Sequence, residues 1–152
     1  MRKVTVLLCC AFLFGCNFGE SEIEPNQFDS DFFRLSTDTQ VKRFHEYDLQ
    51  IQYELVIVGN QVVHPPAIYL AEEFAEQGAA AIPFLRDKLA SAKKEATVRD
   101  IVAILAEMHR LKSYNVGNDS ALMRLVDERV NSMQGQWKSV TLHMLQEIRG
   151  NS

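Results

Sequence analysis

Cysteine offers the most versatile chemistry in this chain, and its placement is uneven. All three cysteines, Cys9, Cys10 and Cys16, lie near the start of the 152 residues, and none follows. A thiol can act as a nucleophile, a metal ligand, half of a disulfide or a site of acylation. Because the chain after Cys16 has no thiol, its fold depends on its core and not on disulfides.

The residues before Cys16 form a pattern typical of exported proteins. Arg2 and Lys3 provide a positively charged start, and an apolar run over residues 4–14 follows. A run of this length matches the hydrophobic region of a signal peptide and is too short to span a bilayer as a helix. An ordinary cleaved signal peptide and an uncleaved apolar N-terminal helix are the alternative interpretations.

Leu13, Phe14, Gly15 and Cys16 resemble the lipobox of bacterial lipoproteins, although Phe14 occupies a position that usually holds a smaller residue. The resemblance implies that residues 1–15 are removed as a signal peptide and that the Cys16 thiol receives a diacylglyceryl group. Two acyl chains anchor a protein stably to a membrane without a spanning helix. Inner-membrane lipoproteins often carry Asp after the cysteine, so Asn17 favours the outer membrane, with the body facing the periplasm.

The other chemistry-bearing residues form no known catalytic or metal-binding motif. No two histidines have the HExxH spacing, and a zinc site needs at least three converging ligands. The chain also lacks a phosphate-binding glycine loop and a Gly-x-Ser-x-Gly nucleophile motif. We therefore expect no catalytic residue, no metal ligand and no cofactor. The histidines in question are His45, His64, His109 and His143.

The charge balance narrows the classes of partner. The formal net charge is −4, and loss of Arg2 and Lys3 with the signal peptide leaves 14 cations and 20 acids, a charge of −6. Nucleic-acid binding requires a basic surface, so we expect no nucleic-acid partner. Hydrophobic residues make up 47% of the chain and charged residues 24%, as in a single globular domain.

Residues 16–36 are expected to be the lipidated cysteine and a flexible acidic tether. Gly19, Pro25 and clustered polar residues favour a loop in this segment. Its four large apolar residues either dock on the body as a latch, which we prefer, or form an exposed strip that binds a partner. These residues are Phe28, Phe32, Phe33 and Leu35.

From Ser36 onward, apolar residues recur at steps of three and four and predict an all-α domain over residues 37–152. The first helix is expected from residue 38 to the mid-fifties, although alternation over residues 49–58 also fits a strand. Breaks at His64-Pro65-Pro66, Gly78 and later loops divide the body into about six helices. Short connections make neighbouring helices antiparallel. Trp137, which begins the last helix, is expected to anchor the core, with an interface role as the alternative.

Two helix pairs, over residues 78–111 and 119–149, have similar patterns. The first resembles a HEAT repeat, with Pro83 early in its first helix and Val98-Arg99 at the start of its second. The resemblance implies a HEAT-like α-solenoid fragment with Val98 facing inward and Arg99 lying along the turn; an irregular helical bundle is the alternative fold. HEAT repeats are binding scaffolds and contribute no catalytic residues.

These patterns predict a lipid-anchored, non-enzymatic protein-interaction module of the cell envelope. Its partners would be the membrane, through the lipid on Cys16, and a protein. An alternative is an inhibitor or immunity-type protein that neutralises a toxin or hydrolase, because a charge of −6 suits a basic target. A third hypothesis is an enzyme whose site is assembled from residues scattered along the chain.

Overall fold

The structure is a computed structural model that describes residues 22–150. These residues form eight α-helices and no strand, which confirms the all-α prediction. The helices are α1 (Gln27–Phe33), α2 (Thr37–Phe44), α3 (Leu49–Gln61), α4 (Tyr69–Ala75), α5 (Ile82–Ser91), α6 (Glu95–Leu111), α7 (Ser120–Ser132) and α8 (Lys138–Gly150), with short 3-10 helices at Gly78–Ala81 and Val116–Asn118. Within the described range, no helix has the length and hydrophobicity needed to cross a membrane.

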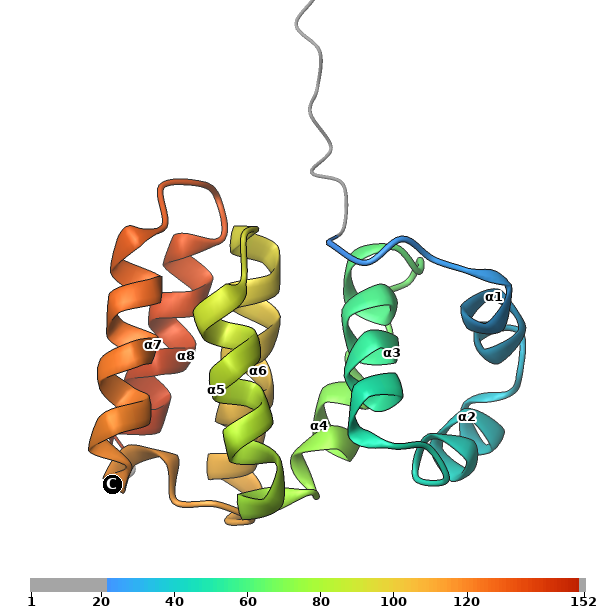
Figure 1. Cartoon of the computed structure of the whole chain (residues 1–152), viewed down its shortest axis with the longest axis horizontal. Coiled ribbons are helices and arrows are strands. Elements are labelled where there is room, and N and C mark those ends of the chain that lie inside the picture. Colours follow the sequence, from blue (N-terminus) through green and yellow to red (C-terminus); the bar gives the residue numbers. More distant parts are fainter. Residues whose placement is uncertain (1–21, 151–152) are drawn as a thin grey trace, which may run out of the picture.

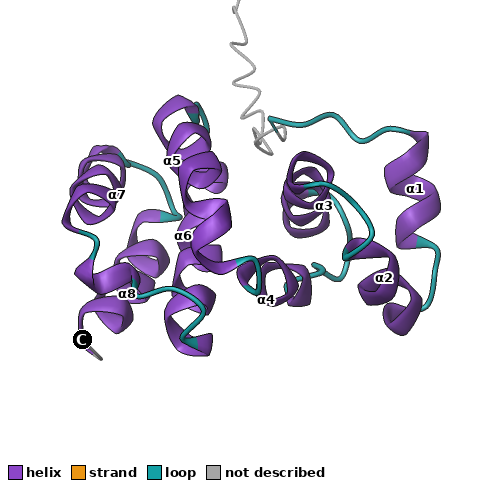
Figure 2. Ribbon diagram, turned by 60° about the horizontal axis from the view of Figure 1, so that its bottom comes forward, coloured by secondary structure: helices purple, strands orange, loops and turns teal. Residues whose placement is uncertain are grey.

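Helices α3 to α8 are arranged in two layers (Figure 2). One layer contains α3, α5 and α7, and the other contains α4, α6 and α8. Within the layers, α5 packs on α7, α4 packs on α6, and α6 packs on α8. Helices α1 and α2 lie beside α3 and close one end of the stack (Figure 1). Because the connections are short, α5 to α8 run alternately up and down.

The core is centred on α6, the longest helix, which packs against α3, α4, α5, α7 and α8. Its inward residues Ile101, Ile104, Leu105 and Met108 are fully buried. Their spacing of three and four residues places them on one side of the helix, as the sequence pattern predicts. Burial of this apolar stripe is what holds the two layers together.

The prediction of one helix from residue 38 to the mid-fifties is wrong, because α2 ends at Phe44 and α3 begins at Leu49. The Asp48 side chain starts α3 by accepting a hydrogen bond of 3.0 Å from the backbone N–H of Ile51. Residues 49–58 are helical, which excludes the strand alternative. Five of the apolar residues among them are buried, so α3 is apolar on most of its sides and the helical period is blurred; these are Tyr53, Leu55, Val56, Ile57 and Val58.

The prediction of a flexible loop through residue 36 is also wrong in part, because residues 27–33 form α1. Asn26 and Asp29 cap this helix reciprocally, each side chain accepting a hydrogen bond from the other's backbone N–H. Of the four residues expected to dock on the body, Phe32 is 2% exposed and Phe33 packs against Gly59 of α3, whereas Phe28 is 41% exposed beside Tyr47. Burial of Phe32 and Phe33 against the body gives so short a helix its stability.

Asp119 is the N-cap of α7 and joins three elements of the second half of the chain. Its carboxylate accepts a hydrogen bond from Leu122 N–H at 3.0 Å, two from Arg86 of α5 at 2.5 and 2.7 Å, and one from the Tyr114 hydroxyl at 2.7 Å. Burial opposes ionisation of this carboxyl, but these donors outweigh it and lower the pKa of Asp119 below its ordinary value.

Candidate functional site

The predicted signal-peptidase motif and lipidation site, Leu13, Phe14, Gly15 and Cys16, lie outside the described residues. Lipidation of Cys16 therefore stays a prediction. The first described residue, Glu22, lies six positions after the cysteine. Its carboxylate accepts hydrogen bonds from the backbone N–H groups of Lys93 and Lys94 in the α5–α6 turn. The chain is therefore attached to the body soon after the predicted anchor.

The three residues that resemble a HEAT motif lie in the α5–α6 pair. Pro83 is in the first turn of α5, where its missing N–H costs no hydrogen bond. Val98 faces the core and is 3% exposed. The Arg99 guanidinium pairs with Asp100 and lies 4.1 Å from the ring centroid of Trp137, which is half-buried against the core. Arg99 thus connects α6 to the start of α8 by a cation–π contact.

Asp100 is the most buried acidic residue of the described range, with 1% exposure. Burial raises the pKa of its carboxyl, although Arg99 and hydrogen bonds from Gln61 (2.7 Å) and Asn60 (3.4 Å) oppose the shift. The carboxylate links the C-terminal end of α3 to α6. Its partners Asn60, Gln61 and Arg99 all belong to α3 or α6. The carboxylate therefore holds these two helices together.

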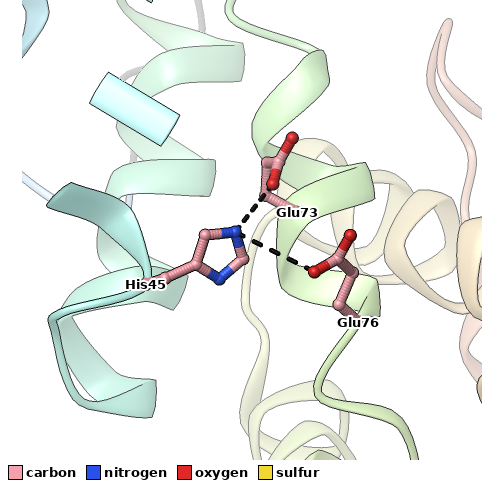
Figure 3. Close-up of side chains that lie close together, drawn as sticks. All are labelled: His45, Glu73 and Glu76. Atoms are coloured by element: carbon pink, nitrogen blue, oxygen red, sulfur yellow. Dashed lines mark hydrogen bonds and ion pairs between the residues drawn. The ribbon is translucent and has the colours of Figure 1, made fainter. Parts of the chain in front are cut away.

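A second group of chemistry-bearing side chains lies on the surface between α2 and α4 (Figure 3). The Nε2 atom of His45 is 2.8 Å from Oε2 of Glu73 and 3.9 Å from Oε2 of Glu76. One ligand atom from each of the three residues lies within 4.8 Å of the others. We call His45, Glu73 and Glu76 the His–Glu cluster; an imidazole nitrogen and two carboxylate oxygens are donors that a transition-metal ion accepts.

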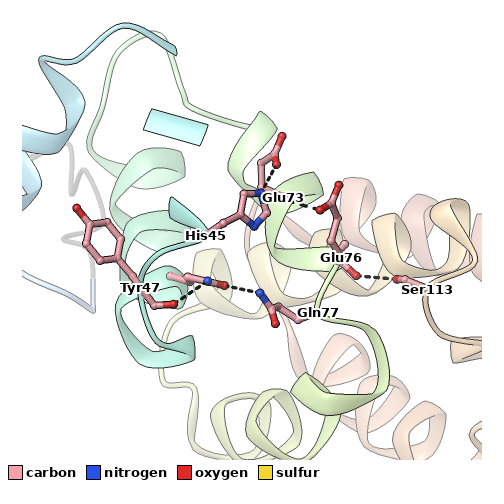
Figure 4. Close-up of polar contacts among 8 residues, drawn as sticks. His45, Tyr47, Glu73, Glu76, Gln77 and Ser113 are labelled. Atoms are coloured by element: carbon pink, nitrogen blue, oxygen red, sulfur yellow. Dashed lines mark hydrogen bonds and ion pairs between the residues drawn. The ribbon is translucent and has the colours of Figure 1, made fainter. Parts of the chain in front are cut away.

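Buried neighbours and backbone hydrogen bonds hold the His–Glu cluster in place. His45 follows Phe44, and Glu73 precedes Phe74; both phenylalanines are fully buried. Hydrogen bonds fix the C-terminal end of α4 on two sides (Figure 4). On one side, Gln77 donates to Gln52 at 3.2 Å, and Gln52 in turn donates to the Tyr47 carbonyl at 2.9 Å. On the other, the Ser113 hydroxyl donates to the Ala75 carbonyl at 2.6 Å.

Sequence reasoning missed this cluster, because His45 lies 28 positions before Glu73. The only local signal is the spacing of Glu73 and Glu76, three residues apart on one helix face. No motif in the sequence therefore indicates that His45 lies beside two acidic side chains. His143 also has an acidic neighbour, Glu147, at 3.5 Å, but it is one carboxylate on the same exposed helix face.

A groove of about 710 Å³ opens between the C-terminal half of α6 and the end of α8. Its lining combines cationic and acidic side chains, among them Arg110, Lys112, Glu107 and Glu147, with the ring of Tyr114. Arg110 is held in place by Glu107 at 2.6 Å and by Glu72 of α4 at 2.7 Å. We call this the α6–α8 groove; it presents polar, orienting groups and apolar area on one surface, as binding sites do.

No protein-family model, curated protein or solved structure matches this chain. A function is therefore inferred from the N-terminal motif, the packing of the helices and the surface geometry of the described residues.

Proposed function

We propose that the chain is a lipid-anchored protein of the bacterial cell envelope whose helical body binds another protein without catalysing a reaction. The anchor is the acylated Cys16, and the site is the outer membrane facing the periplasm, as Asn17 favours. In support, the N-terminus combines a basic start, a short apolar run and Leu13-Phe14-Gly15-Cys16.

The α6–α8 groove is the observation that carries the binding role. At about 710 Å³ it is large enough to receive side chains or a chain segment of a partner. Its charged residues are of both signs, and two of them, Arg110 and Glu107, are already ordered by their mutual ion pair. Side chains that are ordered before binding lose less conformational entropy when a partner arrives.

The helix pairs α3–α4, α5–α6 and α7–α8 are, on this proposal, consecutive units of a HEAT-like solenoid. The support is the layer arrangement, in which the first helices of the pairs form one layer and the second helices form the other (Figure 2). Each unit buries its apolar face against its neighbours, as repeat architectures do. The rings of Tyr53 and Phe84, 5.5 Å apart, connect α3 to α5 in this way.

Mass analysis of the protein extracted from its native membranes tests the anchor. The expected species begins at Cys16 and carries the mass of a diacylglyceryl group, with or without an additional acyl chain. A Cys16→Ser variant should no longer be acylated and should leave the membrane fraction. Native protein that begins at Met1, or that salt removes from membranes, would contradict the anchor.

Site-specific photocrosslinking in intact cells tests the binding role. A photoreactive residue at Asn115, at the edge of the groove, should give one discrete adduct. The matched control is a photoreactive residue at Asp87, which is exposed on α5 in the other layer. An Arg110→Glu substitution should abolish the Asn115 adduct. Equal adducts from both positions, or an adduct that survives Arg110→Glu, would refute the groove as the binding site.

A further inference from the structure

We propose that the His–Glu cluster binds a divalent transition-metal ion, for which Zn²⁺ is the test probe, and that this ion fastens α2 to α4. The site is independent of the proposed envelope role. It consists of Nε2 of His45, at the C-terminal end of α2, and one carboxylate oxygen each from Glu73 and Glu76 at the end of α4. All three side chains point toward one another across the gap between the two helices (Figure 3).

The spacing of the three ligand atoms suits such an ion. Zn–N and Zn–O bonds of roughly 2.0–2.2 Å in a tetrahedron separate neighbouring ligand atoms by about 3.3–3.6 Å. The Nε2–Oε2 distances of 2.8 Å to Glu73 and 3.9 Å to Glu76 bracket that range. The ligand atoms of the third pair, on Glu73 and Glu76, lie within 4.8 Å of each other.

The local charge also favours a cation. Among the described residues, neither Glu73 nor Glu76 pairs with a lysine or arginine, so the two carboxylates and the His45 imidazole lie together without a fixed positive charge. The cluster lies where two helices end, since His45 is the C-terminal cap of α2 and Glu76 that of α4. The C-terminal end of a helix carries partial negative charge and stabilises a nearby cation.

The exposure of the ligands leaves coordination positions for water. The side chains of Glu73, His45 and Glu76 are 21%, 35% and 61% exposed. Three protein ligands and a water molecule complete a four-coordinate site. The fully buried Phe44 and Phe74 fix the backbone next to His45 and Glu73.

Titration of the full-length protein, purified in detergent and treated with chelator, tests this site. Calorimetry with ZnSO₄ should show one site that is lost or weakened at least about tenfold in His45→Ala, because changes even to groups behind metal ligands cost 10–100-fold in affinity. The same loss is expected for Glu73→Gln. Binding should follow the order Zn²⁺ > Mn²⁺, with Mg²⁺ weaker still. All proteins compared carry Cys9→Ser, Cys10→Ser and Cys16→Ser, because thiolates bind Zn²⁺ tightly and would mask the His–Glu cluster.

His143→Ala is the matched control, because His143 also lies beside a glutamate but has one acidic partner. It should bind Zn²⁺ as the wild type does. Zn²⁺ should also raise the unfolding temperature of the wild type and of His143→Ala but not of His45→Ala, since an ion that binds the native state stabilises it. Equal affinity in wild type and His45→Ala, or equal loss in His143→Ala, would overturn the site and leave His45 as an ion-pair partner of Glu73.

Discussion

Gly78 should be the least replaceable glycine of the described chain. It begins the 3-10 helix that follows α4 and has φ +56°, and a Cβ added there would be 2.7 Å from the carbonyl oxygen of Ser113. A left-handed conformation costs a non-glycine residue roughly 1–2 kcal/mol. Moving Ser113 also strains its 2.6 Å hydrogen bond to the Ala75 carbonyl, worth about 1 kcal/mol. Reduced entropy of the unfolded chain offsets about 0.4–1 kcal/mol of this.

The expected result for Gly78→Ala is a loss of about 1–2.5 kcal/mol in the free energy of unfolding. Urea unfolding followed by helical circular dichroism measures it, and at a slope of about 1–3 kcal/mol per molar the midpoint should fall by about 0.3–2.5 M. Gly150→Ala is the matched control, because nothing lies within 4 Å of a Cβ at that position near the end of α8. A Gly78→Ala protein within about 0.5 kcal/mol of the wild type would refute the reasoning.

Three further substitutions test contacts that hold the helices together, by the same urea assay. Asp119→Asn should cost about 1.5–3 kcal/mol at neutral pH, because it removes a charged acceptor from Arg86. The pKa of Asp119 is lower in the folded than in the unfolded state. Its contribution to the free energy of unfolding is therefore present above the pKa of the unfolded state and is lost as pH falls through the pKa of the folded state. The variant should therefore lose less stability than the wild type on acidification, and an equal loss would contradict the assignment. The pKa of Asp100 is raised in the folded state, so protonation of this carboxyl stabilises the wild type as pH falls from neutral. Asp100→Asn lacks this gain and should lose more stability than the wild type over the same pH range. A smaller loss would show that burial does not dominate the pKa of Asp100. Phe74→Ala should cost about 3–5 kcal/mol because it empties a fully buried position, and a cost below about 1 kcal/mol would mean that α4 does not belong to the core.

Local sequence patterns predicted most of the helices because each pattern has a local cause. Pro83 is compatible with the first turn of a helix, Gly78 with a left-handed residue after one, and Asp119 with an N-cap. The wrong predictions concern segments whose structure depends on tertiary contacts. Residues 27–33 form a helix because Phe32 and Phe33 find a surface on the body, and a polar, acidic segment gives no local sign of that surface.

The sequence by itself determined the all-α class, the inward face of α6 and the prediction of a lipid anchor at Cys16, because periodicity, caps and a contiguous motif are properties of neighbouring residues. The tertiary structure alone decided which distant side chains meet. It placed His45 beside Glu73 and Glu76, and it brought the end of α6 beside the end of α8 to form the groove. Such meetings depend on how helices pack across many intervening residues, and no spacing along the chain encodes them.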